Sequence, residues 1–230
     1  MKCSCNFTDF SGRTHSEFIQ DMNNHFFNHR VQIANYKKYV TEETTRVFSD
    51  IKNENRTLST FTSTEIIDKF TSNFSNWCKD KNRIQYDEFH HQQVLLFAET
   101  LSNNGIKVRK KNKRIDGFSD APEDFYNAYA KPLNLLIWHY SLGGNKPLLD
   151  LTNDFEIITK LHPAFDSMLF SGLRGTFAEI SGSTPSCVPK SGGYKYIKKK
   201  IDYYSLLEHV RLCMEKFEVP AIVLEAYWNN

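Results

Sequence analysis

The hydrophobic period of this chain changes near Pro163, and this change constrains the fold more than any other feature. Before it, apolar residues recur at gaps of three and four, the period of helices that bury one face. After it, the residues from Phe165 to Phe170 alternate as in a strand, and a Gly-containing turn leads to a second short strand at Thr176–Ser181. The pattern predicts an α+β fold, with mainly helical N-terminal two thirds and a small C-terminal α/β sheet unit.

The helical part begins with one long predicted helix, roughly His15–Lys52. Thr14 or Ser16 is its expected cap, with Glu17 in the first turn. Its heptad-like spacing is compatible with a homodimer contact through this helix or with packing inside one chain, and both readings stay open. Further elements are predicted as helices from Ser63 or Thr64 onward and over Asp87–Asn103, Pro122–Leu142, Thr152–Leu161 and Ile201–Phe217, with a last strand at Val219–Trp228.

A composition change after Asn104–Gly105 suggests where the regions divide. We predict a helical region over residues 1–105 and a mixed α/β region with a candidate metal site over residues 106–230, which can form one continuous domain. A length of 230 residues suits one large domain or two small ones, and 40% apolar residues support a packed core.

Charge and composition narrow the function classes. The net charge of +2 does not by itself indicate a polyanion partner, so a nucleic-acid prediction must rest on local charge. The sequence has no apolar run long enough to cross a membrane and no signal-peptide pattern at its start, which predicts a cytoplasmic protein without membrane contact. Five irregularly spaced cysteines argue against a disulfide framework.

Local charge is concentrated between Ile106 and Ile115. Such a run either follows a phosphate backbone or forms a solvated hairpin or loop. Read as a nucleic-acid contact, it consists of Lys107, Arg109, Lys110, Lys111, Lys113 and Arg114.

The order of elements over Asp154–Trp228 is helix, strand, turn, strand, helix, strand. This order, with an acid on each of the first two strands, resembles the core of the PD-(D/E)XK nuclease superfamily, which includes many restriction endonucleases. The resemblance implies that Asp166 and Glu179 hold Mg²⁺, with Glu156 as a further metal-binding acid. Mg²⁺ takes one or two protein carboxylates, neutralises charge on a phosphate and activates water, which is what phosphodiester cleavage needs.

One position departs from the family pattern. Ser181 stands where the family has a lysine that orients or activates the attacking water. Lys190, Lys195 or Lys198 can supply the missing charge, and Lys195 is our candidate catalytic residue. The leading prediction is therefore a Mg²⁺-dependent endonuclease of the restriction-enzyme type, acting on DNA in preference to RNA.

Two alternatives remain open. The spacing of Arg83 and His90 resembles the Arg-x4-6-His signature of HEPN ribonucleases, which are helical, usually dimeric and cut RNA without metal. The Ser181 departure equally suits a non-catalytic binding protein or inhibitor that has kept the scaffold.

Overall fold

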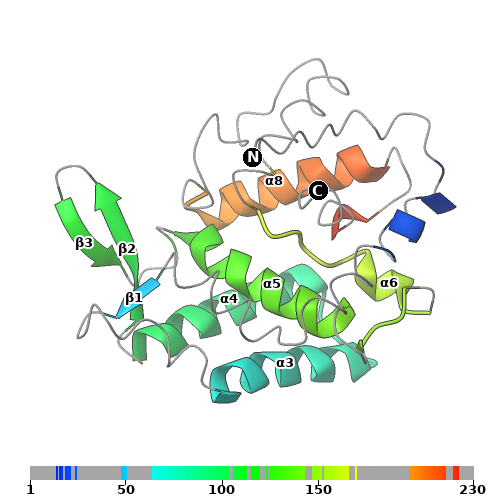
Figure 1. The fold of residues 1–230 in the computed structure, drawn as a ribbon, viewed down its shortest axis with the longest axis horizontal. Coiled ribbons are helices and arrows are strands. Elements are labelled where there is room, and N and C mark those ends of the chain that lie inside the picture. The colour runs from blue at the N-terminus through cyan, green and yellow to red at the C-terminus, as the bar shows by residue number, and fades with distance from the viewer. Residues whose placement is uncertain are drawn as a thin grey trace.

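The structure is a computed structural model, shown in Figure 1. For residues 48–50, 64–66, 106–112 and 115–119 only the backbone is described. The described residues are 14, 16–17, 19–21, 24, 48–50, 64–103, 106–112, 115–119, 123, 125–142, 147–151, 153–165, 169, 197–215 and 220–222.

Helices form the body of the described structure. The longer ones are α3 (Thr64–Lys79), α4 (Tyr86–Asn103), α5 (Tyr126–Leu142) and α8 (Lys200–Glu215), with a single turn, α6 (Phe155–Ile158), between α5 and α8. Helix α5 is rich in apolar residues and buried along almost its whole length, as expected of a central helix. It contacts α3, α4 and α8, and Figure 1 shows it between α8 on one side and α3 on the other.

The first helix pair is joined by aromatic packing. Phe70, Phe74 and Trp77 are buried on one side of α3 at gaps of four and three. The Trp77 ring stacks on Phe89 of α4 with ring centroids 5.4 Å apart, and its indole N–H donates to the Ile84 carbonyl at 2.9 Å. These contacts fix the turn between the two helices and so set the position of the first turn of α4.

The start of α5 is tied to the segment that leads into α8. The Tyr126 N–H donates to the Lys198 carbonyl at 2.7 Å, and the Asn127 N–H donates to the Ile197 carbonyl at 3.2 Å. Amides in the first turn of a helix have no partner within the helix, so these carbonyls satisfy two of them. The contact brings the beginnings of α5 and α8 together.

A three-stranded antiparallel sheet accompanies the helices, in the order β1 (Phe48–Asp50), β2 (Ile106–Asn112), β3 (Ile115–Ser119). In Figure 1 the β2–β3 hairpin extends away from the helical body, and β2 follows directly on α4. Arg109 pairs with Phe118 and Lys111 with Asp116 across the hairpin, while Phe48 of β1 pairs with Val108 of β2.

The predicted α+β class is wrong. The described chain is mainly helical, and its sheet is formed by residues between 48 and 119 rather than by a C-terminal unit. Leu169, in the predicted strand from Phe165 to Phe170, is helical, and Ala221–Ile222 form a 3₁₀ turn where the last strand was expected. Short apolar runs fit a buried helix or turn as well as a strand, so their periodicity was ambiguous. The predicted strand at Thr176–Ser181 lies outside the described residues.

The predicted N-terminal helix is right at its start and wrong at its end. The Thr14 N–H donates to the Glu17 carboxylate at 2.7 Å, and the Glu17 N–H donates back to the Thr14 hydroxyl at 3.4 Å. This reciprocal pair is a capping box, as the sequence suggested. At the other end, Phe48–Asp50 is strand β1, because pairing with β2 satisfies its backbone. Residues 25–47, the main part of the proposed dimer contact, lie outside the described residues.

One hydrophobic core includes residues on both sides of the predicted boundary at 105/106, from Ile67 on α3 to Ile222 near the end of the chain. None of the described helices has both the length and the apolar character needed to cross a bilayer.

Candidate functional site

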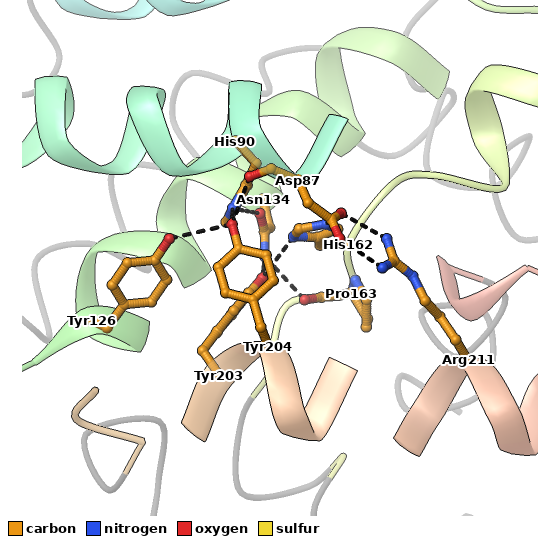
Figure 2. Close-up of polar contacts among 9 residues, drawn as sticks. All are labelled: Asp87, His90, Tyr126, Asn134, His162, Pro163, Tyr203, Tyr204 and Arg211. Carbon is orange, nitrogen blue, oxygen red and sulfur yellow. Dashed lines mark hydrogen bonds and ion pairs between the residues drawn. The ribbon is translucent and has the colours of Figure 1, made fainter. Parts of the chain in front are cut away.

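A closed circuit of hydrogen bonds lies where α4, α5 and α8 meet, and we call it the polar circuit (Figure 2). It starts at the Asp87 side chain and returns to the Asp87 carbonyl. Its members come from α4, α5, the segment after α6, and α8. In order they are Asp87, His162, Tyr203, Asn134, His90 and Tyr204.

Asp87 is the charged end of the polar circuit. Its carboxylate accepts two hydrogen bonds from the Arg211 guanidinium, both at 2.8 Å, and one from His162 Nε2 at 2.8 Å. Burial raises the pKa of the Asp87 carboxyl, but the hydrogen bonds from Arg211 and His162 outweigh it and hold the pKa well below its usual range. Asp87 is therefore ionised, and it forms a bidentate ion pair with Arg211 at the half-buried edge of the circuit.

His162 links this ion pair to the interior. Its side chain is fully buried, and burial lowers its pKa to about 4 in spite of the Asp87 carboxylate, so the imidazole is neutral at pH 7. Because Nε2 donates to Asp87, the other nitrogen, Nδ1, accepts from the Tyr203 hydroxyl at 3.1 Å. The Tyr203 oxygen in turn accepts from the Asn134 amide at 2.9 Å.

Asn134 fixes the rest of the circuit. Its amide nitrogen also donates to the Pro163 carbonyl at 3.0 Å, and a carbonyl can only accept, so the orientation of the amide is determined. Its side-chain oxygen therefore accepts from His90 Nε2 at 2.8 Å. Burial, with a further contribution from His162, lowers the pKa of His90 well below the ordinary value, so His90 is also neutral at pH 7.

The last step of the circuit has one proton for two acceptors. The Tyr204 hydroxyl lies 2.8 Å from the Asp87 carbonyl and 3.1 Å from His90 Nδ1, which carries a lone pair when His90 is neutral. Tyr204 has a single proton to donate, while the Tyr126 hydroxyl donates to its oxygen at 3.4 Å. A proton on His90 Nδ1 would satisfy both contacts, but burial disfavours it.

The polar circuit holds helices together, and its two histidines are buried. His90 and His162 are 0% and 2% exposed, and their ring centroids lie 4.2 Å apart. An imidazole that transfers protons to a substrate must come within hydrogen-bond reach of it. These rings instead connect α4 to α5 and α8, which is a positioning and stabilising role.

The Arg83 and His90 pair of the ribonuclease alternative has separate partners. The Arg83 guanidinium lies over the Trp77 ring at 5.3 Å and forms an ion pair with Glu156 at 3.6 Å. His90 belongs to the interior of the polar circuit. The described contacts therefore do not bring the two residues together, and the His90 ring is closed to substrate within this chain.

Of the four residues assigned to the metal-dependent site, Asp166, Glu179, Glu156 and Lys195, the structure describes Glu156. Glu156 is exposed on α6, accepts a hydrogen bond from Lys160 at 2.8 Å, and has a lowered pKa because of that bond and the nearby cations. Asp166, Glu179 and Lys195 lie outside the described residues, so their proposed roles stay predictions. Within the described part of the chain, no group of three or more His, Cys, Asp or Glu residues is arranged to hold a metal ion.

The predicted basic run forms the β2–β3 hairpin. Lys113 and Arg114, between the strands, lie outside the described residues. The other four basic residues belong to β2, where alternate residues share a face. Lys107, Arg109 and Lys111 are therefore on one face and Lys110 is on the other. The pairing register adds Ser49, Phe118 and Asp116 to the face with three cations, and we call these six residues the basic face.

Comparisons with protein-family models, with curated proteins and with solved structures find no match to this chain.

Proposed function

We propose that the protein binds nucleic acid through the basic face of the β2–β3 hairpin. The observation that carries the proposal is the register, which gathers Lys107, Arg109 and Lys111 on one face of a hairpin that extends from the helical body. Contacts between such cations and phosphates release counterions and supply most of the affinity of non-specific nucleic-acid binding.

The distribution of charge supports this proposal. Residues 106–119 contain six basic residues and one acidic residue, whereas the whole chain has a net charge of only +2. The net charge of the hairpin is therefore more positive than the net charge of the whole protein, and the remaining residues are net acidic. The concentration of positive charge in the hairpin favours it as a contact for a polyanion.

The test is a titration of labelled DNA and RNA at several salt concentrations. The variant Lys107→Ala/Arg109→Ala/Lys111→Ala should lose about tenfold or more in affinity, and its salt slope should flatten by about 2 because three phosphate contacts are gone. The matched control, Lys69→Ala/Lys79→Ala/Lys81→Ala, removes the same charge from exposed positions elsewhere. Equal losses in the two variants would mean that overall charge, rather than the hairpin, governs binding.

The Mg²⁺-dependent nuclease predicted from the sequence extends the proposal from binding to cleavage. It assigns the metal to Asp166 and Glu179, with Glu156 as a further acid and Lys195 as the residue that assists the attacking water. Incubation of plasmid DNA and of RNA with Mg²⁺ or with EDTA tests it. Cleavage that needs Mg²⁺ and is lost in Asp166→Asn supports a nuclease, whereas binding without cleavage supports a non-catalytic binding protein.

A further inference from the structure

We infer that the basic face takes single-stranded nucleic acid, with Phe118 as a platform on which a base stacks. This inference rests on the proposed function and specifies its ligand. The register pairs Phe118 of β3 directly with Arg109 of β2. Residues that pair across an antiparallel hairpin share a face, so an aromatic residue stands among the cations rather than apart from them.

Phe118 is not on the face of the sheet that holds the other apolar residues, where an amphipathic hairpin would place it. The opposite face of the sheet holds the other four apolar residues of the three strands, Phe48, Ile106, Val108 and Ile115, together with Asp50, Lys110, Asn112, Gly117 and Ser119. A phenylalanine whose purpose was only to be buried would be expected with that apolar set. Phe118 instead belongs to the face with Lys107, Arg109 and Lys111, which combines an aromatic ring with phosphate-binding groups.

The spacing of this face suits an extended strand of nucleic acid. Alternate residues of a β-strand are about 6.7 Å apart, so the three cations of β2 form a row about 13 Å long. Phe118 lies beside the middle of that row, on a strand about 5 Å away. A flexible single strand can follow the cations with its phosphates while one of its bases turns toward the neighbouring strand.

The ring is the element that distinguishes single strands from duplexes. In a duplex the faces of the bases are covered by their stacked neighbours, so a protein aromatic ring has no base to stack on. In a single strand each base offers its π-face, and stacking on aromatic side chains is tolerant of sequence. We therefore expect single-stranded DNA and RNA to bind more tightly than duplex, with little preference among sequences.

The cations of this face should contribute unequally. Asp116 pairs with Lys111, and an acid directly opposite a lysine offsets its charge, whereas Ser49 pairs with Lys107 and Phe118 with Arg109. Arg109 has the further advantage that a guanidinium plane also stacks on bases. Lys107→Ala and Arg109→Ala should therefore weaken binding more than Lys111→Ala does.

The experiment compares labelled 20-mers of single-stranded dT, single-stranded U and duplex DNA by fluorescence anisotropy across a salt series. We expect the single strands to bind the wild-type chain about tenfold more tightly than the duplex. Phe118→Leu keeps an apolar side chain but removes the aromatic ring, and it should lower single-strand affinity about tenfold while leaving duplex affinity and the salt slope unchanged. Phe118→Trp should keep single-strand affinity within about twofold of wild type.

The outcomes separate this inference from the proposed function. A wild-type preference for duplex, or equal losses for single strand and duplex in Phe118→Leu, would overturn the stacking role while the charge variants still define a nucleic-acid surface. If the triple charge variant also binds like wild type, the proposed function itself fails. Thermal unfolding of each variant, followed by circular dichroism, shows whether a loss of affinity comes from a misfolded hairpin.

Discussion

The polar circuit and the basic face use similar residue types in opposite ways. In the circuit, Asp87 and Arg211 neutralise each other, and the histidines are buried with a partner on each ring nitrogen. On the basic face, three cations are gathered on one side of a hairpin, where like charges repel. In the circuit, the paired charges join α4 to α8. We attribute the charge that is concentrated on the projecting hairpin to the binding of an external anion.

The largest expected effect is the loss of the Asp87 carboxylate. Asp87→Ala removes the partner of Arg211 and of buried His162, and it should lower the free energy of unfolding by about 3 kcal/mol. Urea unfolding followed by circular dichroism measures it. Glu88→Ala, the neighbouring exposed acid in the same first turn of α4, is the control and should cost no more than about 0.5 kcal/mol. Similar costs for the two variants would contradict a stabilising circuit.

The next largest effect should come from the centre of the circuit. Asn134→Leu keeps the branched shape of the side chain but leaves His90, Tyr203 and the Pro163 carbonyl without their buried partner. Unsatisfied buried groups of this kind should cost about 2 kcal/mol or more in the same unfolding assay. Asn73→Leu, at a half-buried amide with a single bond to Gln93, should cost less. Nucleic-acid affinity at a temperature where both variants are folded should not change.

Acid should weaken the circuit before it affects the hairpin. His162 has a folded-state pKa of about 4, and the pKa of His90 is also lowered, whereas an unfolded histidine titrates near 6.5. When folding lowers the pKa of a histidine, the neutral buried ring stabilises the fold fully above about pH 6.5. This stabilisation is lost as the pH falls toward the pKa of the histidine in the folded protein. The contribution of His162 to the free energy of unfolding should fall by roughly 2 kcal/mol between pH 7.5 and pH 5. An unfolding free energy that stays constant over this range would show that the histidines are not buried as neutral groups.

The smallest effect on stability should come from the basic face. Lys107→Ala/Arg109→Ala/Lys111→Ala removes mutual repulsion and should change the free energy of unfolding by no more than about 0.5 kcal/mol, in either direction. The same variant should show the largest change in nucleic-acid binding. A strongly destabilised variant would mean that these cations have partners within the protein. The basic face would then resemble the polar circuit in using its charges to stabilise the fold.

Several elements could be predicted because their signals are local. Helix α4 was expected over Asp87–Asn103 and is observed over Tyr86–Asn103, because acids in its first turn and Asn104–Gly105 after its end mark both limits. The start of α3 at Thr64 agrees with the cap that was expected at Ser63 or Thr64. The strand expected at Phe165 to Phe170 was wrong because a six-residue apolar run lacks the length needed to distinguish helix from strand.

Local patterns in the sequence were enough to predict the helical periods, a cap at Thr14 or Ser16 and the concentration of positive charge before Ile115, since each depends on neighbours within a few positions. The choice of Thr14 as the cap, and the meeting of Asp87 with His162 and Arg211, which are 75 and 124 positions away, came from the folded structure. The folded structure also decided that Phe118 shares a face with Arg109, because strand register is set by backbone pairing across the hairpin. The physical reason is the same in both cases. A hydrogen bond or a cross-strand pair depends on distances of a few ångströms in space, and residues far apart in the chain meet at such distances only after the helices and strands have packed.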